Sequence, residues 1–140
     1  MVKMRKYSLI LVLALTAVLF TNCDHPEKAR QEIYSGTEQM IRYGDYQAAE
    51  KHFDKAIKYD KNNPEAYYGR GCSKANMKRY QDAIIDFEKA VELKPDYADA
   101  YFNLGQMYFY INDYDMMCYS YKLAKENGRD NLEDVMRSCQ

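Results

Sequence analysis

The chain has 140 residues, 47% hydrophobic and 29% charged, so it can bury one globular core and is not a disordered tail. Its net charge of −1 gives no electrostatic basis for binding nucleic acid. Two histidines and four scattered cysteines are too few for a zinc framework, and we expect neither a metal nor a cofactor.

The N-terminus has the pattern of an export signal. Residues 1–6 contain three basic side chains and no acidic one, and residues 7–20 form an apolar run that is shorter than the roughly 20 residues needed to span a bilayer. Cys23 follows closely, and the arrangement resembles a bacterial lipoprotein signal. The resemblance implies that residues 1–22 are removed and that Cys23 carries the lipid.

Asn22 departs from the small residue that usually precedes the lipidated cysteine. An ordinary secreted signal and an uncleaved anchor therefore remain alternatives. All three interpretations export residues 24–140, so disulfides are permitted. We expect a lipoprotein anchored in a bacterial cell envelope, periplasmic or cell-surface, with residues 23–29 as a short tether.

The rest of the chain repeats with a period of 34 residues, in units 30–63, 64–97 and 98–131. Fixed self-similarity at this period predicts a stack of supersecondary units. Corresponding positions hold residues of one kind: Ala56, Ala90 and Ala124; Phe53, Phe87 and Tyr121; Tyr46, Tyr80 and Tyr114.

Each unit is predicted to contain two helices. In the second unit, Pro64 begins the first helix and the pair Lys78-Arg79 makes the turn. The second helix runs over residues 80–93 and stops before Pro95. Small residues let the paired helices approach closely, and Phe87 fills the gap beside them.

These units resemble the tetratricopeptide repeat (TPR). The second unit carries nearly the whole signature, the third has Arg129 in place of the closing proline, and the first is weaker. The signature residues of the second unit are Tyr67, Gly71, Tyr80, Ala83, Phe87, Ala90 and Pro95. The resemblance implies an all-α superhelix of three repeats whose concave surface, lined by the first helix of each unit, binds a peptide or a helix.

By the same resemblance, a set of residues faces this groove: Tyr34, Glu38, Ile41 and Arg42; Tyr68 and Asn76; Phe102, Gln106, Phe109 and Tyr110. Tyr34, Tyr68 and Phe102 share one position and would form an aromatic row that anchors a partner. The alternative is that the row packs against itself or against the segment before residue 30.

TPR domains that clamp a C-terminal carboxylate use basic and amide side chains on these helices. Glu65 and Asp99 are also at groove-facing positions by this resemblance. Arg42 is the one basic residue at these positions, and Glu38, Glu65 and Asp99 would repel a carboxylate. The pattern therefore favours an amphipathic or weakly basic partner segment.

Residues 132–140 are predicted to cap the open end of the third repeat. Gly128 ends the preceding helix, Asn131 begins the cap helix, and Leu132, Val135, Met136 and Cys139 fall on its buried face. Cys118 occupies the position that faces the cap, so a Cys118–Cys139 disulfide is one prediction. Two inert buried thiols are the alternative.

Catalysis is not expected. Cys72 and His52 are predicted on different helices and different faces, and His52 has no evident partner. We therefore expect a non-catalytic, lipid-anchored adaptor or assembly factor that binds another protein in its groove. The alternative is a structural subunit that forms a homodimer through the same groove.

Overall fold

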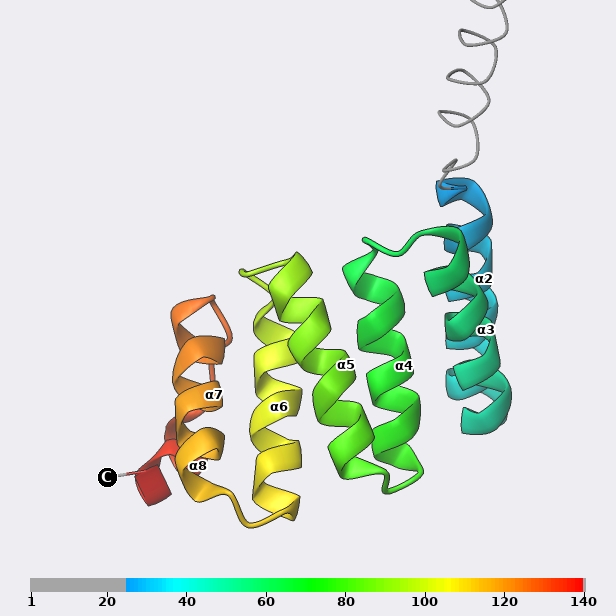
Figure 1. The fold of residues 1–140 in the computed structure, drawn as a ribbon. Coiled ribbons are helices and arrows are strands. Elements are labelled where there is room, and N and C mark those ends of the chain that lie inside the picture. Colours follow the sequence, from blue (N-terminus) through cyan, green and yellow to red (C-terminus); the bar gives the residue numbers. More distant parts are fainter. Residues whose placement is uncertain (1–24, 140) are drawn as a thin grey trace, which may run out of the picture.

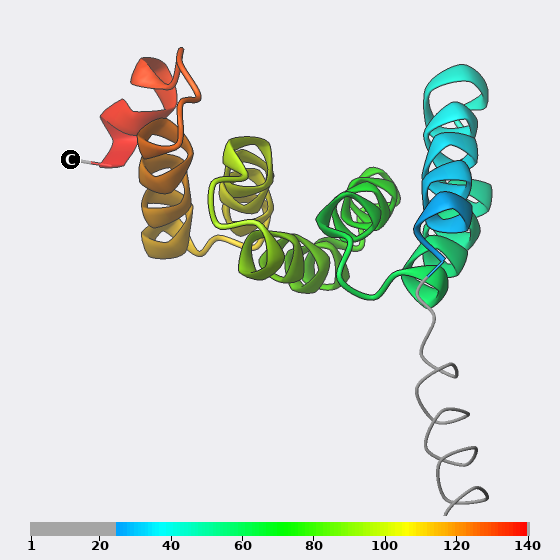
Figure 2. The ribbon, with the colours of Figure 1, turned by 90° about the horizontal axis from the view of Figure 1, so that it is seen from above.

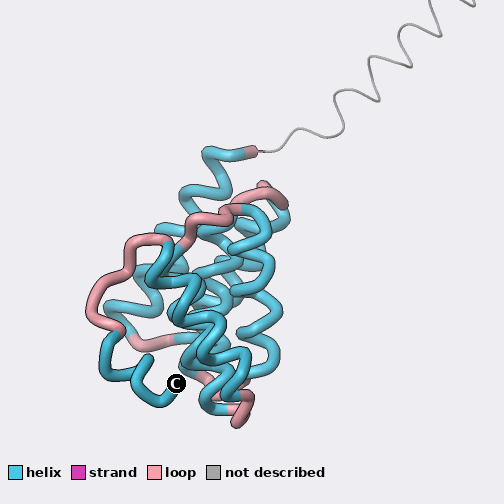
Figure 3. Tube along the Cα trace, turned by 90° about the vertical axis from the view of Figure 1, so that its left-hand side faces the viewer, coloured by secondary structure: helices cyan, strands magenta, loops and turns pink. Residues whose placement is uncertain are grey.

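The computed structural model describes residues 25–139, which form three helical hairpins placed side by side (Figure 1). The first pairs α2 (Pro26–Glu38), continued by η1 (Gln39–Tyr43), with α3 (Tyr46–Tyr59). The second pairs α4 (Pro64–Asn76) with α5 (Tyr80–Leu93), and the third pairs α6 (Ala98–Tyr110) with α7 (Tyr114–Glu126). The short α8 (Glu133–Met136) and η2 (Arg137–Cys139) complete the arrangement, in which helices joined by loops are the only regular elements of residues 25–139 (Figure 3).

The 34-residue period is visible in the backbone of the turns. Gly44, Lys78 and Asn112 have φ angles of 65°, 61° and 62°, so each hairpin turns through a left-handed residue at the same position. The helix that follows then begins, and the side chains of Asp45 and Asp113 accept hydrogen bonds from its first backbone amides.

The hairpins stack along a curve (Figure 2). α5 lies on the outer side of the bend, and α4 and α6 lie nearer its inside. The first helices of neighbouring hairpins contact each other, α2 with α4 and α4 with α6, and each second helix contacts the first helix of the next hairpin. The predicted all-α stack of three repeats is therefore confirmed.

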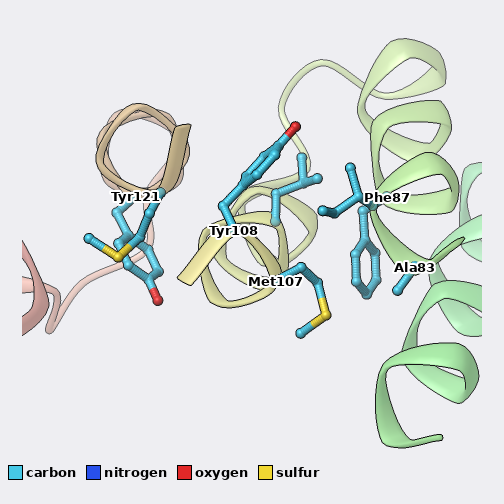
Figure 4. Packing of buried hydrophobic residues seen from close by; sticks show 8 residues of the cluster. Ala83, Phe87, Met107, Tyr108 and Tyr121 are labelled. Carbon is cyan, nitrogen blue, oxygen red and sulfur yellow. The ribbon is translucent and has the colours of Figure 1, made fainter. Parts of the chain in front are cut away.

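Glycines allow the helices of each hairpin to approach closely. A Cβ atom added to Gly71 would lie 2.7 Å from the Phe87 ring, and one on Gly105 would lie 2.6 Å from the Tyr121 ring. Figure 4 shows Phe87 facing Met107 across the boundary between the second and third hairpins. The aromatic residue of the second helix thus fills the space beside the glycine, as the repeat pattern predicts.

The first helix begins earlier than the repeat pattern indicated. α2 starts at Pro26, so residues 26–29, which we predicted to be tether, are helical. Pro26 stabilises the first turn, Ala29 is fully buried, and the His25 backbone amide donates to the Tyr59 carbonyl at 2.9 Å. The predicted signal segment 1–22 and lipidated Cys23 lie outside the described residues. Among residues 25–139, no helix has the length and apolar character needed to cross a membrane.

The cap differs from its prediction in detail. Gly128 does end α7 with a φ of 93°, but Asn131 is itself left-handed, with a φ of 64°, and cannot serve as the helix start. α8 instead follows Leu132, which is buried. Met136 packs against the core, whereas Val135, predicted on the same buried face, remains 38% exposed because the helix lasts only one turn.

A disulfide joins Cys118 of α7 to Cys139 at the end of the cap. The bond closes a loop of 21 residues and holds η2 against the third hairpin. Because cross-linking lowers the entropy of the unfolded chain, we expect reduction to lower the free energy of unfolding by about 3 kcal/mol. Urea unfolding with and without reductant measures this difference.

The control for that experiment is a chain with both Cys118→Ser and Cys139→Ser. Reductant should leave its unfolding midpoint unchanged. An oxidised native chain should also gain the mass of two hydrogens on reduction, and a native chain without that mass change would contradict the bond.

Candidate functional site

We call the surface that holds the predicted groove residues of α2, η1, α4 and α6 the inner face. Four large hydrophobic side chains on it remain open to solvent. Tyr34 and Ile41 are 71% and 78% exposed in the first hairpin, and Phe109 and Tyr110 are 52% and 54% exposed in the third. Large apolar side chains that are more than half exposed mark a candidate interaction surface.

Tyr68 is less available than its position in the repeat indicated. Its ring lies 4.9 Å from that of Tyr97 and 5.7 Å from that of Phe87. The Asn103 side-chain amide donates to the Tyr68 hydroxyl at 3.2 Å. Burial, together with the nearby Cys72 thiol, raises the pKa of Tyr68 above its usual range, and burial raises the pKa of Tyr97 to about 12. Tyr68 is therefore a neutral, partly covered side chain.

Phe102 is covered by a cation from the loop after α7. The Arg129 guanidinium lies 3.9 Å from the centre of the Phe102 ring and pairs with Asp99. In two units, a residue near the end of the repeat thus shields the aromatic position of that same repeat. In the first unit the residue that corresponds to Tyr97 is Asn63, whose side chain caps α4 instead.

The predicted aromatic row is therefore not a uniform exposed surface. Tyr34 is open, whereas Tyr68 and Phe102 are half-buried by side chains of the same chain. The covering residues come from loops that do not repeat in sequence, so the 34-residue pattern carried no signal for them.

The charged and amide residues of the inner face are mostly engaged within the chain. Arg42 pairs with Glu38 at 2.7 Å. The Asn76 side chain donates to the Cys72 carbonyl at 2.8 Å. Glu65 and Asp99 lie in the first turns of α4 and α6. A carboxylate ligand would therefore meet Arg42 and Arg129, each already paired with a carboxylate of this chain.

Cys72 and His52 do not form a catalytic arrangement. Burial raises the pKa of the Cys72 thiol to about 11, which keeps it protonated and unreactive at neutral pH. His52 lies with its Nδ1 atom 2.6 Å from a Glu32 carboxylate oxygen, so the expectation that it lacks a partner was wrong. Among the described residues no group of three metal-binding side chains is present.

A pocket of about 280 Å³ opens beside the exposed aromatic residues of the third hairpin. We call it the cap pocket, because it lies between α6, α7 and the C-terminal cap. It brings together the predicted residues Gln106, Phe109 and Tyr110 with four residues that sequence reasoning did not assign to a site: Met117, Tyr121, Val135 and Ser138. The sequence did contain one indication of this pocket: Met117 stands where the other two repeats have Ala49 and Ala83.

Phe109 and Tyr110 of this pocket also contact the rings of Tyr80 and Tyr114, and we call these four rings the aromatic cluster. Tyr80 stacks on Tyr110 with the ring centres 4.7 Å apart. Phe109 meets Tyr110 and Tyr114 edge to face, at 5.8 Å and 6.3 Å. Tyr80 and Tyr114 occupy the same position in successive repeats, the first position of the second helix.

Three family models of the tetratricopeptide repeat match this chain, over residues 52–85, 76–110 and 98–127. The Hsp70-Hsp90 organizing protein of Triticum aestivum is 37% identical over 92 residues, which are 64% of this chain and 16% of that protein. Hsp70-Hsp90 organizing protein 2 of Arabidopsis thaliana is 32% identical over 124 residues, 81% of this chain and 22% of that protein. The chain thus spans about a fifth of the length of these relatives.

Solved structures share the fold. The first TPR domain of Spaghetti (RPAP3), bound to the HSP90 peptide SRMEEVD, superposes with a TM-score of 0.78 at 23% identity, over 84% of this chain and 94% of that one. YrrB, a TPR protein with an unusual peptide-binding site, has a TM-score of 0.69 at 20% identity, over 81% of this chain and 58% of that one. From the sequence matches and the fold together, residues 52–127 of this chain are tetratricopeptide repeats.

Proposed function

We propose that this protein is a non-catalytic binding module that holds a peptide or helix of another protein on its inner face. The observation that carries the proposal is the exposure of Tyr34, Ile41, Phe109 and Tyr110, all at positions that the repeat pattern assigns to the groove. Apolar side chains of this size anchor partners because their burial releases water. The HSP90 peptide bound to the RPAP3 domain supports peptide binding as a use of this fold.

We further propose that Cys23 carries a lipid and that the module works at a bacterial envelope membrane, as an adaptor or assembly factor. The three basic residues among residues 1–6 and the apolar run 7–20 before Cys23 support this. The first helix begins at Pro26, so the domain would lie close to the lipid surface. Intact mass of the protein from its native membrane tests the anchor. A mass of residues 23–140 plus lipid is expected, and an unmodified full chain would contradict it.

Site-specific photocrosslinking in the native cell tests the binding surface. A photoreactive amino acid placed at Tyr34 or at Tyr110 should give a discrete adduct with a partner protein. The matched control positions are Ile85 and Tyr119, which are exposed to a similar degree but lie on the second helices α5 and α7. We expect no adduct from these two.

Each pattern of adducts has a distinct meaning. Adducts from the control positions alone would contradict an inner-face binding module. An adduct of twice the chain's own mass, from Tyr34 or Tyr110, would contradict the adaptor function and favour a structural subunit that self-associates.

A further inference from the structure

Four aromatic rings among the described residues have a cation of this chain over them, whereas the rings of the aromatic cluster have none. Lys28, Arg70, Lys94 and Arg129 lie over the rings of Tyr59, Tyr67, Tyr97 and Phe102, at 5.6, 5.6, 4.6 and 3.9 Å from the ring centres. Within residues 25–139, no lysine or arginine lies over Tyr80, Phe109, Tyr110 or Tyr114. Exposed aromatic faces attract cations electrostatically, so these four offer a site that the chain does not fill.

The electrostatic surroundings of the cluster favour a positive ligand. Phe109 and Tyr110 form the last turn of α6, where the helix dipole is negative, and that turn contains no basic residue. Asp113 and Asp115 flank Tyr114 and line the same surface depression with it. Within the described residues, neither carboxylate forms an ion pair with a lysine or arginine of this chain.

The cap pocket supplies the apolar half of the site. Phe109 and Tyr110 belong both to the cluster and to the pocket, so the two are continuous. The pocket floor is formed by Met117 and Tyr121, which are buried in the core. Its volume of about 280 Å³ is enough for one large apolar side chain.

We propose that the third hairpin and the cap bind a partner segment in which a lysine or arginine lies next to a large apolar residue. The apolar side chain enters the cap pocket, and the cation lies on the aromatic cluster beside Asp113 and Asp115. This inference rests on the proposed function and narrows it, because it places the main anchor at the C-terminal end of the inner face and states the chemistry of the partner.

A selection of random short peptides on the full chain in detergent tests this chemistry. Selected peptides should be enriched in a lysine or arginine adjacent to a leucine, methionine or phenylalanine. A selected peptide should bind about tenfold more weakly when its basic residue is replaced by glutamate. The unaltered selected peptide should also bind about tenfold more weakly to the Tyr110→Ala variant and to the Asp115→Lys variant. Asp115 is at the surface, so its replacement should not disturb the fold.

Tyr119→Ala is the matched control, because Tyr119 is an equally exposed tyrosine on α7 outside both cluster and pocket. Its affinity for the selected peptide should equal that of the unaltered chain, and circular dichroism should show all three variants folded. Enrichment of acidic peptides, or equal binding by Tyr110→Ala, would overturn the inference. Adducts from Tyr34 in the crosslinking experiment would then still support an inner-face binding module, so the two proposals fail separately.

Discussion

Replacing Asp86 with alanine is expected to lower the free energy of unfolding by about 3–5 kcal/mol, because it breaks a buried ion pair from one side. Asp86 is 1% exposed. Its carboxylate accepts from Arg70 Nε and Nη2 at 2.9 and 2.6 Å, and Lys74 Nζ lies 2.7 Å away. Without Asp86, two largely buried cations would lose their main counter-charge.

Asp54→Ala is the matched control, because Asp54 pairs with the same Arg70 at 2.8 Å but is half-exposed. Solvent screens that contact, so its loss should cost no more than about 1 kcal/mol. Urea unfolding of both variants gives the comparison. Equal destabilisation by the two substitutions would show that the burial of Asp86 does not make its ion pairs more important for stability than the exposed Asp54–Arg70 pair. A variant that replaces Arg70, Lys74 and Asp86 together by apolar residues should recover most of the loss.

Replacing Phe53 with alanine is expected to cost a similar 3–5 kcal/mol. Phe53 is 1% exposed and packs between two glycines of neighbouring hairpins. A Cβ atom on Gly69 would lie 2.3 Å from the ring, and one on Gly36 would lie 3.0 Å from it. The ring therefore joins the first hairpin to the second, and its removal leaves a cavity at that boundary.

Gly69→Ala approaches the same contact from the other side. In an exposed helix this change would stabilise by about 1 kcal/mol, since alanine is the better helix former. Here we expect destabilisation by about 1–3 kcal/mol, because the new methyl group overlaps the ring. Chemical denaturation of Gly69→Ala with and without Phe53→Leu measures the coupling. If the changes in unfolding free energy caused by Gly69→Ala and Phe53→Leu simply add, the contact between the new methyl group and the ring is not what makes Gly69→Ala destabilising.

The repeat pattern predicted the fold closely because its cause is local and periodic. α5 runs from Tyr80 to Leu93, the range expected from its apolar face and from Pro95. The left-handed turn at Lys78 falls within the predicted turn pair Lys78-Arg79, and Gly44 and Asn112 turn at the same position of the other two repeats. Each of these features depends on neighbours in the sequence, which a single repeat already contains.

The candidate site was less predictable, because long side chains from unlike loops decide what is exposed. Arg129 covers Phe102 from a position where the second repeat has Pro95. Arg70 and Lys74 both pair with Asp86, whose position holds His52 and Ser120 in the other repeats, so this carboxylate has no counterpart there. Non-repeating residues leave no trace in a 34-residue period.

In the native setting, we expect a partner to cover the inner face and to leave the exposed side chains of the second helices α5 and α7 uncovered. Hydroxyl-radical footprinting compares side-chain oxidation in the native membrane with that of the purified chain. We predict protection of Tyr34, Phe109 and Tyr110, with Ile85 and Tyr119 oxidised equally in both samples. Protection of Ile85 and Tyr119, with the inner-face residues still oxidised, would contradict the claim.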